Sequence, residues 1–203
     1  MSKVGPDYKS LIRSYRRKYS PYRRKELSLF ARQESIVAVI TKACGEKTSH
    51  RRRFKKTVLK EFARRVLSVK SAVRKCGNFK DLYDVIFENK IKGIGRLTVY
   101  DSALHIGAYK GLKPKEIYLH RGAKAGAKVI GIYKRGARTL KMEDMPGALC
   151  RLKPYEIEDF LCIYKKELSG KKSDKFKSCG ARANNKVSCF TPKRTCYSQS
   201  KPH

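Results

Sequence analysis

The stretch that decides the fold runs from residue 78 to residue 110. It reads Asn-Phe-Lys-Asp-Leu-Tyr-Asp-Val-Ile-Phe-Glu-Asn-Lys (78–90), Ile-Lys-Gly-Ile-Gly (91–95) and Arg-Leu-Thr-Val-Tyr-Asp-Ser-Ala-Leu-His-Ile-Gly-Ala-Tyr-Lys (96–110). The apolar residues of the first part recur at helical spacing after Asn78, which favours a helix N-cap. Those of the last part do the same up to Gly111, which favours a helix end. The sequence predicts two helices, from Asn78 to about Asn89 and from about Arg96 to Tyr109, joined by a short turn.

The residues of the turn, 91–95, are suited to binding an anion. Gly93 and Gly95 permit a tight turn with positive φ and leave no Cβ between the chain and a phosphate. Ile94 is expected to anchor the turn in the core, while Lys92 and Arg96 flank it with full charges. The amides that begin the next helix, up to Thr98, would then point at an anion. Such donors read phosphate and not base sequence.

The order helix, apolar-x-Gly-apolar-Gly, helix resembles the helix-hairpin-helix motif of DNA-binding proteins. The resemblance rests on residues 91–98 between their two helices, and it extends to about residue 130 if the downstream helix is included. Residues 82–163 as a block also resemble a stretch shared by uncharacterised bacterial proteins. The resemblance implies DNA binding through the backbone.

One enzyme family shares this arrangement, the helix-hairpin-helix DNA glycosylases. Their catalytic Asp would fall on Tyr118 in the run Ile117-Tyr118-Leu119-His120, and the lysine nucleophile of the bifunctional members would fall on Leu97. Neither residue can stabilise a developing sugar cation as a carboxylate does. Asp101 is expected to be a structural residue on the surface. The sequence therefore predicts no catalytic residues and no enzyme.

Charge indicates the class of partner. The 203 residues include 50 Lys plus Arg against 17 Asp plus Glu, a net charge of +33. This charge recruits polyanions and releases their counterions on binding. No apolar run approaches the ~18 residues of a membrane span, and the N-terminus, with Asp7 and Lys9, is unlike a signal peptide. We expect no membrane partner and a cytoplasmic location associated with nucleic acid.

The cysteines and histidines suggest no cofactor or metal. Seven cysteines are scattered without a Cys-x-x-Cys pair, which favours reduced thiols over a zinc or redox motif. The tail residues Cys179, Cys189, Cys196 and His203 have spacings that match no common zinc finger. His105 and His120 are expected to be ordinary core or surface histidines.

The charge distribution divides the chain. Residues 1–80 carry a net +19, residues 81–164 a net +5 and residues 165–203 a net +9. We expect a basic arm at 1–24 that is mobile or only partly helical, a basic helical region at 25–77, a helix-hairpin-helix domain at 78–167 and a disordered tail at 168–203. The tyrosines of the arm could stack on nucleobases or dock the arm onto its own domain.

Further helices supply the candidate basic surface. We predict helices at 25–43, at 49–77 with Ser49 as its cap, near 122–130, and from Pro154 to about Ile163, with a loop at 131–150. The outward face of the helix predicted at 49–77 would either bind phosphates or be merely solvated. Its candidate residues are Arg51, Arg52, Lys55, Lys56, Lys60, Arg64 and Arg65, and the later helix adds Arg121, Lys124 and Lys128.

These observations predict an all-α protein with a helix-hairpin-helix core, basic N-terminal helices and a basic tail. The predicted function is sequence-independent binding of DNA, duplex or branched. Two alternatives remain open: a structured-RNA or ribosome-associated protein, and a DNA-repair enzyme of glycosylase ancestry with unrecognised catalytic groups.

Overall fold

The computed structural model describes residues 6–170, and within this range the protein is mainly helical. Its α-helices are α1 (Tyr8–Lys18), α2 (Ser20–Ala31), α3 (Ile36–Gly45), α4 (Lys56–Ser68), α5 (Lys70–Lys75), α6 (Phe79–Glu88), α7 (Arg96–Lys110), α8 (Arg121–Val129) and α9 (Pro154–Ile163). Short 3-10 turns are η1 (Ser49–Arg51), η2 (Met142–Asp144), η3 (Leu149–Arg151) and η4 (Glu167–Ser169). Two short strands, β1 (Ile117–Tyr118) and β2 (Thr139–Leu140), pair antiparallel. The all-α prediction is confirmed at the level of fold class.

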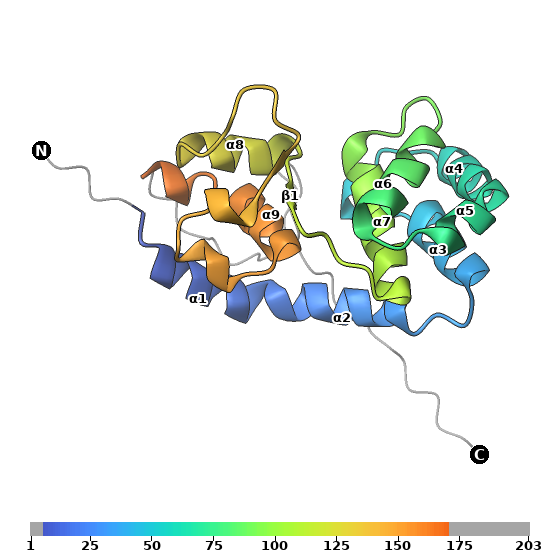
Figure 1. The fold of residues 1–203 in the computed structure, drawn as a ribbon, viewed down its shortest axis with the longest axis horizontal. Coiled ribbons are helices and arrows are strands. Elements are labelled where there is room, and N and C mark those ends of the chain that lie inside the picture. Colours follow the sequence, from blue (N-terminus) through green and yellow to red (C-terminus); the bar gives the residue numbers. More distant parts are fainter. Residues whose placement is uncertain (1–5, 171–203) are drawn as a thin grey trace, which may run out of the picture.

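Two hydrophobic cores divide the described chain into two lobes that lie side by side (Figure 1). The central lobe comprises α3 to α7, whose apolar residues form one shared core. The terminal lobe comprises α1, α8, α9 and the segments between β1 and η4. The chain therefore enters the terminal lobe, builds the central lobe, and returns.

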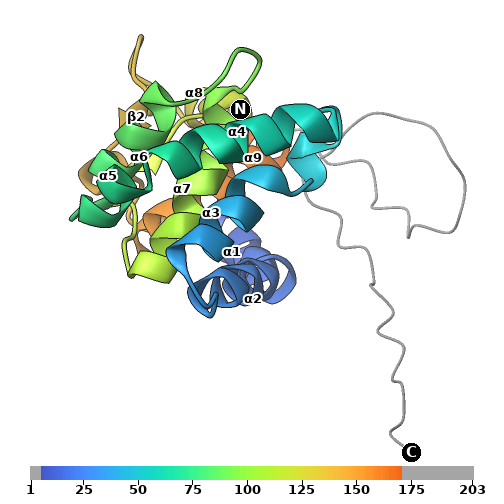
Figure 2. The same cartoon turned by 90° about the vertical axis from the view of Figure 1, so that its right-hand side faces the viewer.

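Helices α1 and α2 run along one edge of the molecule, beneath both lobes (Figures 1 and 2). The basic arm at 1–24, expected to be mobile or only partly helical, is helical over most of its length from Tyr8 onward. Ile12 and Tyr15 are buried in the terminal core, and Tyr15 packs edge-on against Phe160. Of the two roles considered for the arm's tyrosines, Tyr15 has the docking one.

The helices predicted within residues 78–110 and from Pro154 onward are confirmed, together with the residues that begin or end them. The side chain of Asn78 accepts a hydrogen bond from the amide of Asp81 at 2.9 Å and caps α6. Gly111 ends α7 in the left-handed conformation with φ of 72°. Pro154 is the first residue of α9. These local signals worked because each acts within one turn of the chain.

Two longer helix predictions were wrong. Residues 25–43 form parts of α2 and α3, since Ser35 caps a new helix by accepting from the amide of Ala38 at 3.1 Å. Residues 49–77 form η1, α4 and α5, so Ser49 does not cap the long helix and α4 begins only at Lys56. The apolar spacing was continuous across the breaks, and it could not show that the chain turns there.

Helix α8 lies directly against α9. A Cβ on Gly126 would overlap the backbone of Leu161, so this close approach requires glycine. The predicted loop at 131–150 contains β2 and two 3-10 turns. Of the predicted disordered tail, residues 168–170 are described and Leu168 is buried, while the remainder, with its cysteines, lies outside the described residues. No helix of residues 6–170 is both long and apolar enough to cross a membrane.

Candidate functional site

The turn between α6 and α7, residues 89–95, is held from inside the protein. Ile94 is buried in the central core, and its amide donates to the carbonyl of Ile91 at 3.1 Å. Gly93 has φ of 90°, a conformation that side chains rarely adopt, whereas Gly95 is extended with φ of −87°. The expectation of a positive φ therefore holds for Gly93 alone. Gly95 has open space around it.

The first turn of α7 has amide donors without acceptors inside the helix. Gly95 is its N-cap without any side-chain hydrogen bond, and the first intrahelical donor is the amide of Val99, which bonds to the Gly95 carbonyl at 3.2 Å. The amides of Arg96, Leu97 and Thr98 precede it and have no partner within the helix. Lys92 and Arg96 are exposed beside them, and the Arg96 guanidinium lies 5.3 Å from the Phe87 ring centroid. The Thr98 side chain is buried, so this residue can contribute only its backbone.

A second helix begins beside the same space. Helix α8 has His120 as its N-cap, also without a side-chain hydrogen bond, and its first turn starts with Arg121 and Gly122. A cavity of about 810 Å³ is lined by both helix starts. Each helix N-terminus carries a partial positive charge, so two such ends here attract anions.

Four cationic side chains line this cavity, from four different parts of the chain. They are Arg23 on α2, Arg96 on α7, Arg121 on α8 and Lys165 after α9. The sequence did not single out Arg23 or Lys165, because neither stands near the turn along the chain.

Carboxylates also line the cavity, and they were missed. Asp101 was expected on the surface, but it is only 6% exposed and lines the cavity with Glu158 and Asp159. The available signal was that Asp101 lies on the second turn of a helix and stands between the apolar residues Val99, Tyr100, Ala103 and Leu104. Burial lowers the pKa of His120 to about 4 although Asp101 acts in the opposite direction, so this imidazole is neutral near pH 7.

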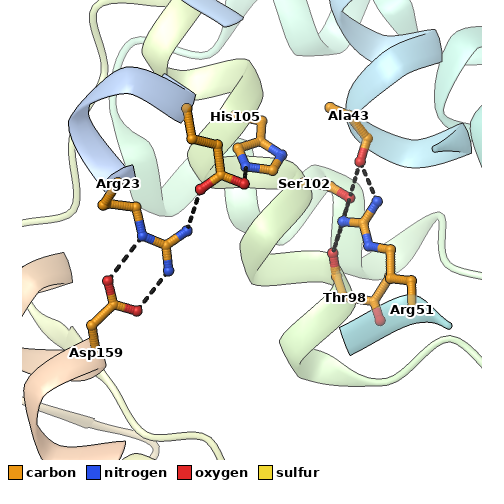
Figure 3. A network of polar contacts seen from close by, with 8 residues as sticks. Arg23, Ala43, Arg51, Thr98, Ser102, His105 and Asp159 are labelled. Atoms are coloured by element: carbon orange, nitrogen blue, oxygen red, sulfur yellow. Dashed lines mark hydrogen bonds and ion pairs between the residues drawn. The ribbon is translucent and has the colours of Figure 1, made fainter. Parts of the chain in front are cut away.

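Asp159 is held by a buried bidentate ion pair (Figure 3). The Arg23 guanidinium donates from Nη2 to Oδ1 at 2.6 Å and from Nε to Oδ2 at 2.9 Å. The same guanidinium donates from Nη1 to Glu26 at 3.0 Å, and Glu26 lies 3.2 Å from Nε2 of His105. The chain Asp159, Arg23, Glu26, His105 thereby connects α9 of the terminal lobe through α2 to α7 of the central lobe. Burial would raise the pKa of Glu26, but His105 and Arg23 outweigh it and lower the pKa to about 2.

Arg51, expected on the basic binding face, is instead fully buried. Its guanidinium donates to the carbonyls of Ala43 and Thr98 and to the Ser102 hydroxyl, the last at 2.8 Å (Figure 3). It therefore fixes η1 against α3 and α7 and cannot meet a phosphate. As one base in a run of three, it gave no signal of burial.

The other predicted basic residues are at the surface. Arg52, Lys55, Lys56, Lys60 and Arg65 are exposed around the start and outer face of α4. Arg64 is exposed but pairs with Glu61 at 2.6 Å. On α8 only Arg121 lines the cavity, whereas Lys124 and Lys128 lie over the Tyr133 ring at 4.8 and 5.3 Å from its centroid.

Tyr118, which the sequence resemblance aligned with the glycosylase Asp, packs among aromatic rings. Its ring centroid lies 4.8 Å from that of Tyr83 and 5.1 Å from that of Tyr100, and burial raises its pKa. Leu97 lines the cavity at the start of α7. Tyr118 thus serves as packing between the two lobes.

Among residues 6–170, no group of three His, Cys, Asp or Glu side chains is placed to hold a metal ion. Comparison of the chain with family models, with curated proteins and with solved structures found no match.

Proposed function

We propose that the protein binds the phosphate backbone of DNA without reading its sequence, through a helix-hairpin-helix element formed by α6, the turn and α7. The observation that carries the proposal is the pair of helix N-termini, α7 and α8, at one cavity flanked by Arg96 and Arg121. Neither end is satisfied by a capping side chain. A phosphate oxygen would supply the missing acceptor.

The net charge of +33 supports a large number of phosphate contacts. We expect the logarithm of the affinity for duplex DNA to fall with the logarithm of salt concentration with a slope on the order of −5, as for six or more contacted phosphates. Lys92→Ala and Arg96→Ala should each make the slope shallower by about one unit. Fluorescence anisotropy across a salt series measures this, with exposed Lys75→Ala on α5 as the matched control. A parent slope shallower than about −2 would contradict the proposal.

The same donors would hold an RNA phosphate, so the preferred nucleic acid has to be determined by competition. Unlabelled duplex DNA, single-stranded DNA and structured RNA compete for the protein at one salt concentration. We expect duplex DNA to be the strongest competitor. Preferential displacement by structured RNA would replace DNA with RNA as the partner.

A second candidate function, an enzyme acting on DNA, is favoured by one observation: the buried carboxylate of Asp101 lies in the cavity beside the α7 N-terminus. A carboxylate so placed can stabilise positive charge that develops on a bound group. Under this candidate, the protein releases bases from lesion-bearing duplexes, and Asp101→Asn lowers the rate at least about 100-fold, as for other preorganised charges. If bases were released at the same rate with and without the protein, the tested lesion would be excluded as a substrate.

A further inference from the structure

The edge formed by α1 and α2 carries a dense positive charge that the hairpin site does not use. Residues 8–25 hold eight basic side chains and no acidic one, and all but Arg23 are exposed. Seven cations therefore lie on one helical edge. Such a surface repels itself unless counterions or a polyanion cover it.

The positions of these cations follow from how α1 packs. Ile12 and Tyr15 turn inward to the terminal core, which places Lys9, Arg13 and Arg17 outward at intervals of four residues. Four residues of helix span about 6 Å, so the row is about 12 Å long. One strand of a duplex presents a phosphate about every 3.4 Å along the axis, so such a row can contact several phosphates.

A recess lies beside this row, and all the charged side chains that line it are cationic. The cavity measures about 500 Å³, and its basic side chains are Lys9, Arg13, Arg16 and Arg151. Arg16 is fixed there because its Nη2 donates to the carbonyl of Arg151 at 2.8 Å. The cavity at the starts of α7 and α8 carries carboxylates as well as cations. The recess beside α1 has no carboxylate, so this recess suits a fully ionised phosphate.

The two basic surfaces lie at opposite edges of the molecule. In both views the loop between α6 and α7 is at the top and α1 with α2 is at the bottom (Figures 1 and 2). Helix α7 runs from the turn toward α2, where His105 meets Glu26, and its 15 residues span about 22 Å. A straight duplex that crosses the turn at right angles to α7 therefore lies about that far from α2 and leaves the α1–α2 edge free for a second duplex.

We propose that the α1–α2 edge is a second nucleic-acid contact surface, so that one protein molecule holds two duplex segments at once. The inference rests on the proposed function for the first segment and adds the second. A nucleic acid fits this edge better than a membrane, because α1 uses its apolar face in the core and α2 exposes only two large hydrophobic side chains, Tyr22 and Leu29, too few for the apolar face that an interfacial helix inserts into lipid.

The test uses two short duplexes of about 16 base pairs, too stiff to bend around the protein since the persistence length is about 150 base pairs. One duplex is immobilised and the other is fluorescent. The full chain should retain the fluorescent duplex, and mass photometry should show one protein with two duplexes. Lys9→Gln/Arg13→Gln/Arg17→Gln should reduce retention at least tenfold and leave one duplex per protein, with affinity for that duplex within about threefold of the parent. The control, Lys70→Gln/Arg74→Gln/Lys75→Gln on α5, removes the same charge and should retain two.

Several results would overturn the inference. A parent complex with one duplex would do so, as would a complex of two proteins with two duplexes, since bridging would then come from dimers. Equal loss in the α5 control would assign the effect to bulk charge. If the α1 variant kept two duplexes and lost binding only to anionic lipid vesicles, the edge would be a membrane surface. If Gly93→Val kept parental binding while the α1 variant lost all of it, the proposed function would fail and α1 would be the sole site.

Discussion

Replacement of Arg23 by alanine is expected to destabilise the protein by about 3–5 kcal/mol, the usual cost of leaving one partner of a buried ion pair uncompensated. Arg23 is almost fully buried, and its guanidinium contacts both Asp159 and Glu26. Without it, two carboxylates remain between the lobes with no cation between them. Chemical denaturation measures the loss, and the exposed neighbour Arg24→Ala is the matched control.

A double-mutant cycle separates this pair from general packing. Arg23→Met and Asp159→Asn should each destabilise the protein, and the double variant should lose less than the sum of the two single losses, because removing both groups leaves no unpaired charge at position 159. Strict additivity of the two single losses would show that the pair does not couple α2 to α9. A loss for Arg23→Ala no larger than for Arg24→Ala would show the same.

Local signals in the sequence predicted the helices that begin and end within one turn. Asn78, Gly111 and Pro154 each act through a bond or torsion of their own neighbourhood, and each lies where it was expected. The break before Ser35 also has a local cap, but the apolar spacing across it concealed the turn. Periodicity shows which face is buried and leaves open where the chain reverses.

The charged residues were harder to assign, because burial depends on partners distant in sequence. Arg23 meets Asp159 across 136 residues, and Arg51 meets Ser102 across 51. Both stand in runs of bases that look alike in the sequence. For the same reason Asp101 could not be placed in the cavity, since its other walls come from α2, α8 and α9. The sequence thus identified the turn and not the cavity beside it.

Gly93→Val is expected to weaken DNA binding about 100-fold, the largest effect on binding that we predict for one substitution. Gly93 has φ of 90°, and a β-branched residue resists that conformation, so the turn must rearrange. The first-turn amides of α7 would then lose their direction. Loss of about two charge-assisted hydrogen bonds, at about 1.5 kcal/mol each, corresponds to a factor of this size.

Two further substitutions show whether the backbone conformation of Gly93 causes the loss. A Cβ at Gly93 meets nothing within 4 Å, so the effect comes from φ alone, and Gly93→Asn should recover much of the affinity because Asn tolerates positive φ. Gly136→Val imposes similar strain at a turn with φ of 82° in another loop and should leave binding near the parental value.

Gly95→Val tests the approach of phosphate separately, since Gly95 is extended with open space around it and valine fits there without strain. Loss of binding in this variant, with helix content and unfolding cooperativity unchanged, would mean that the side chain occupies the place of a phosphate. If Gly93→Val and Gly95→Val both stay folded and bind like the parent, the turn is only a connector between α6 and α7. The exposed bases around α4, such as Lys56 and Lys60, would then be the leading candidates for the binding surface.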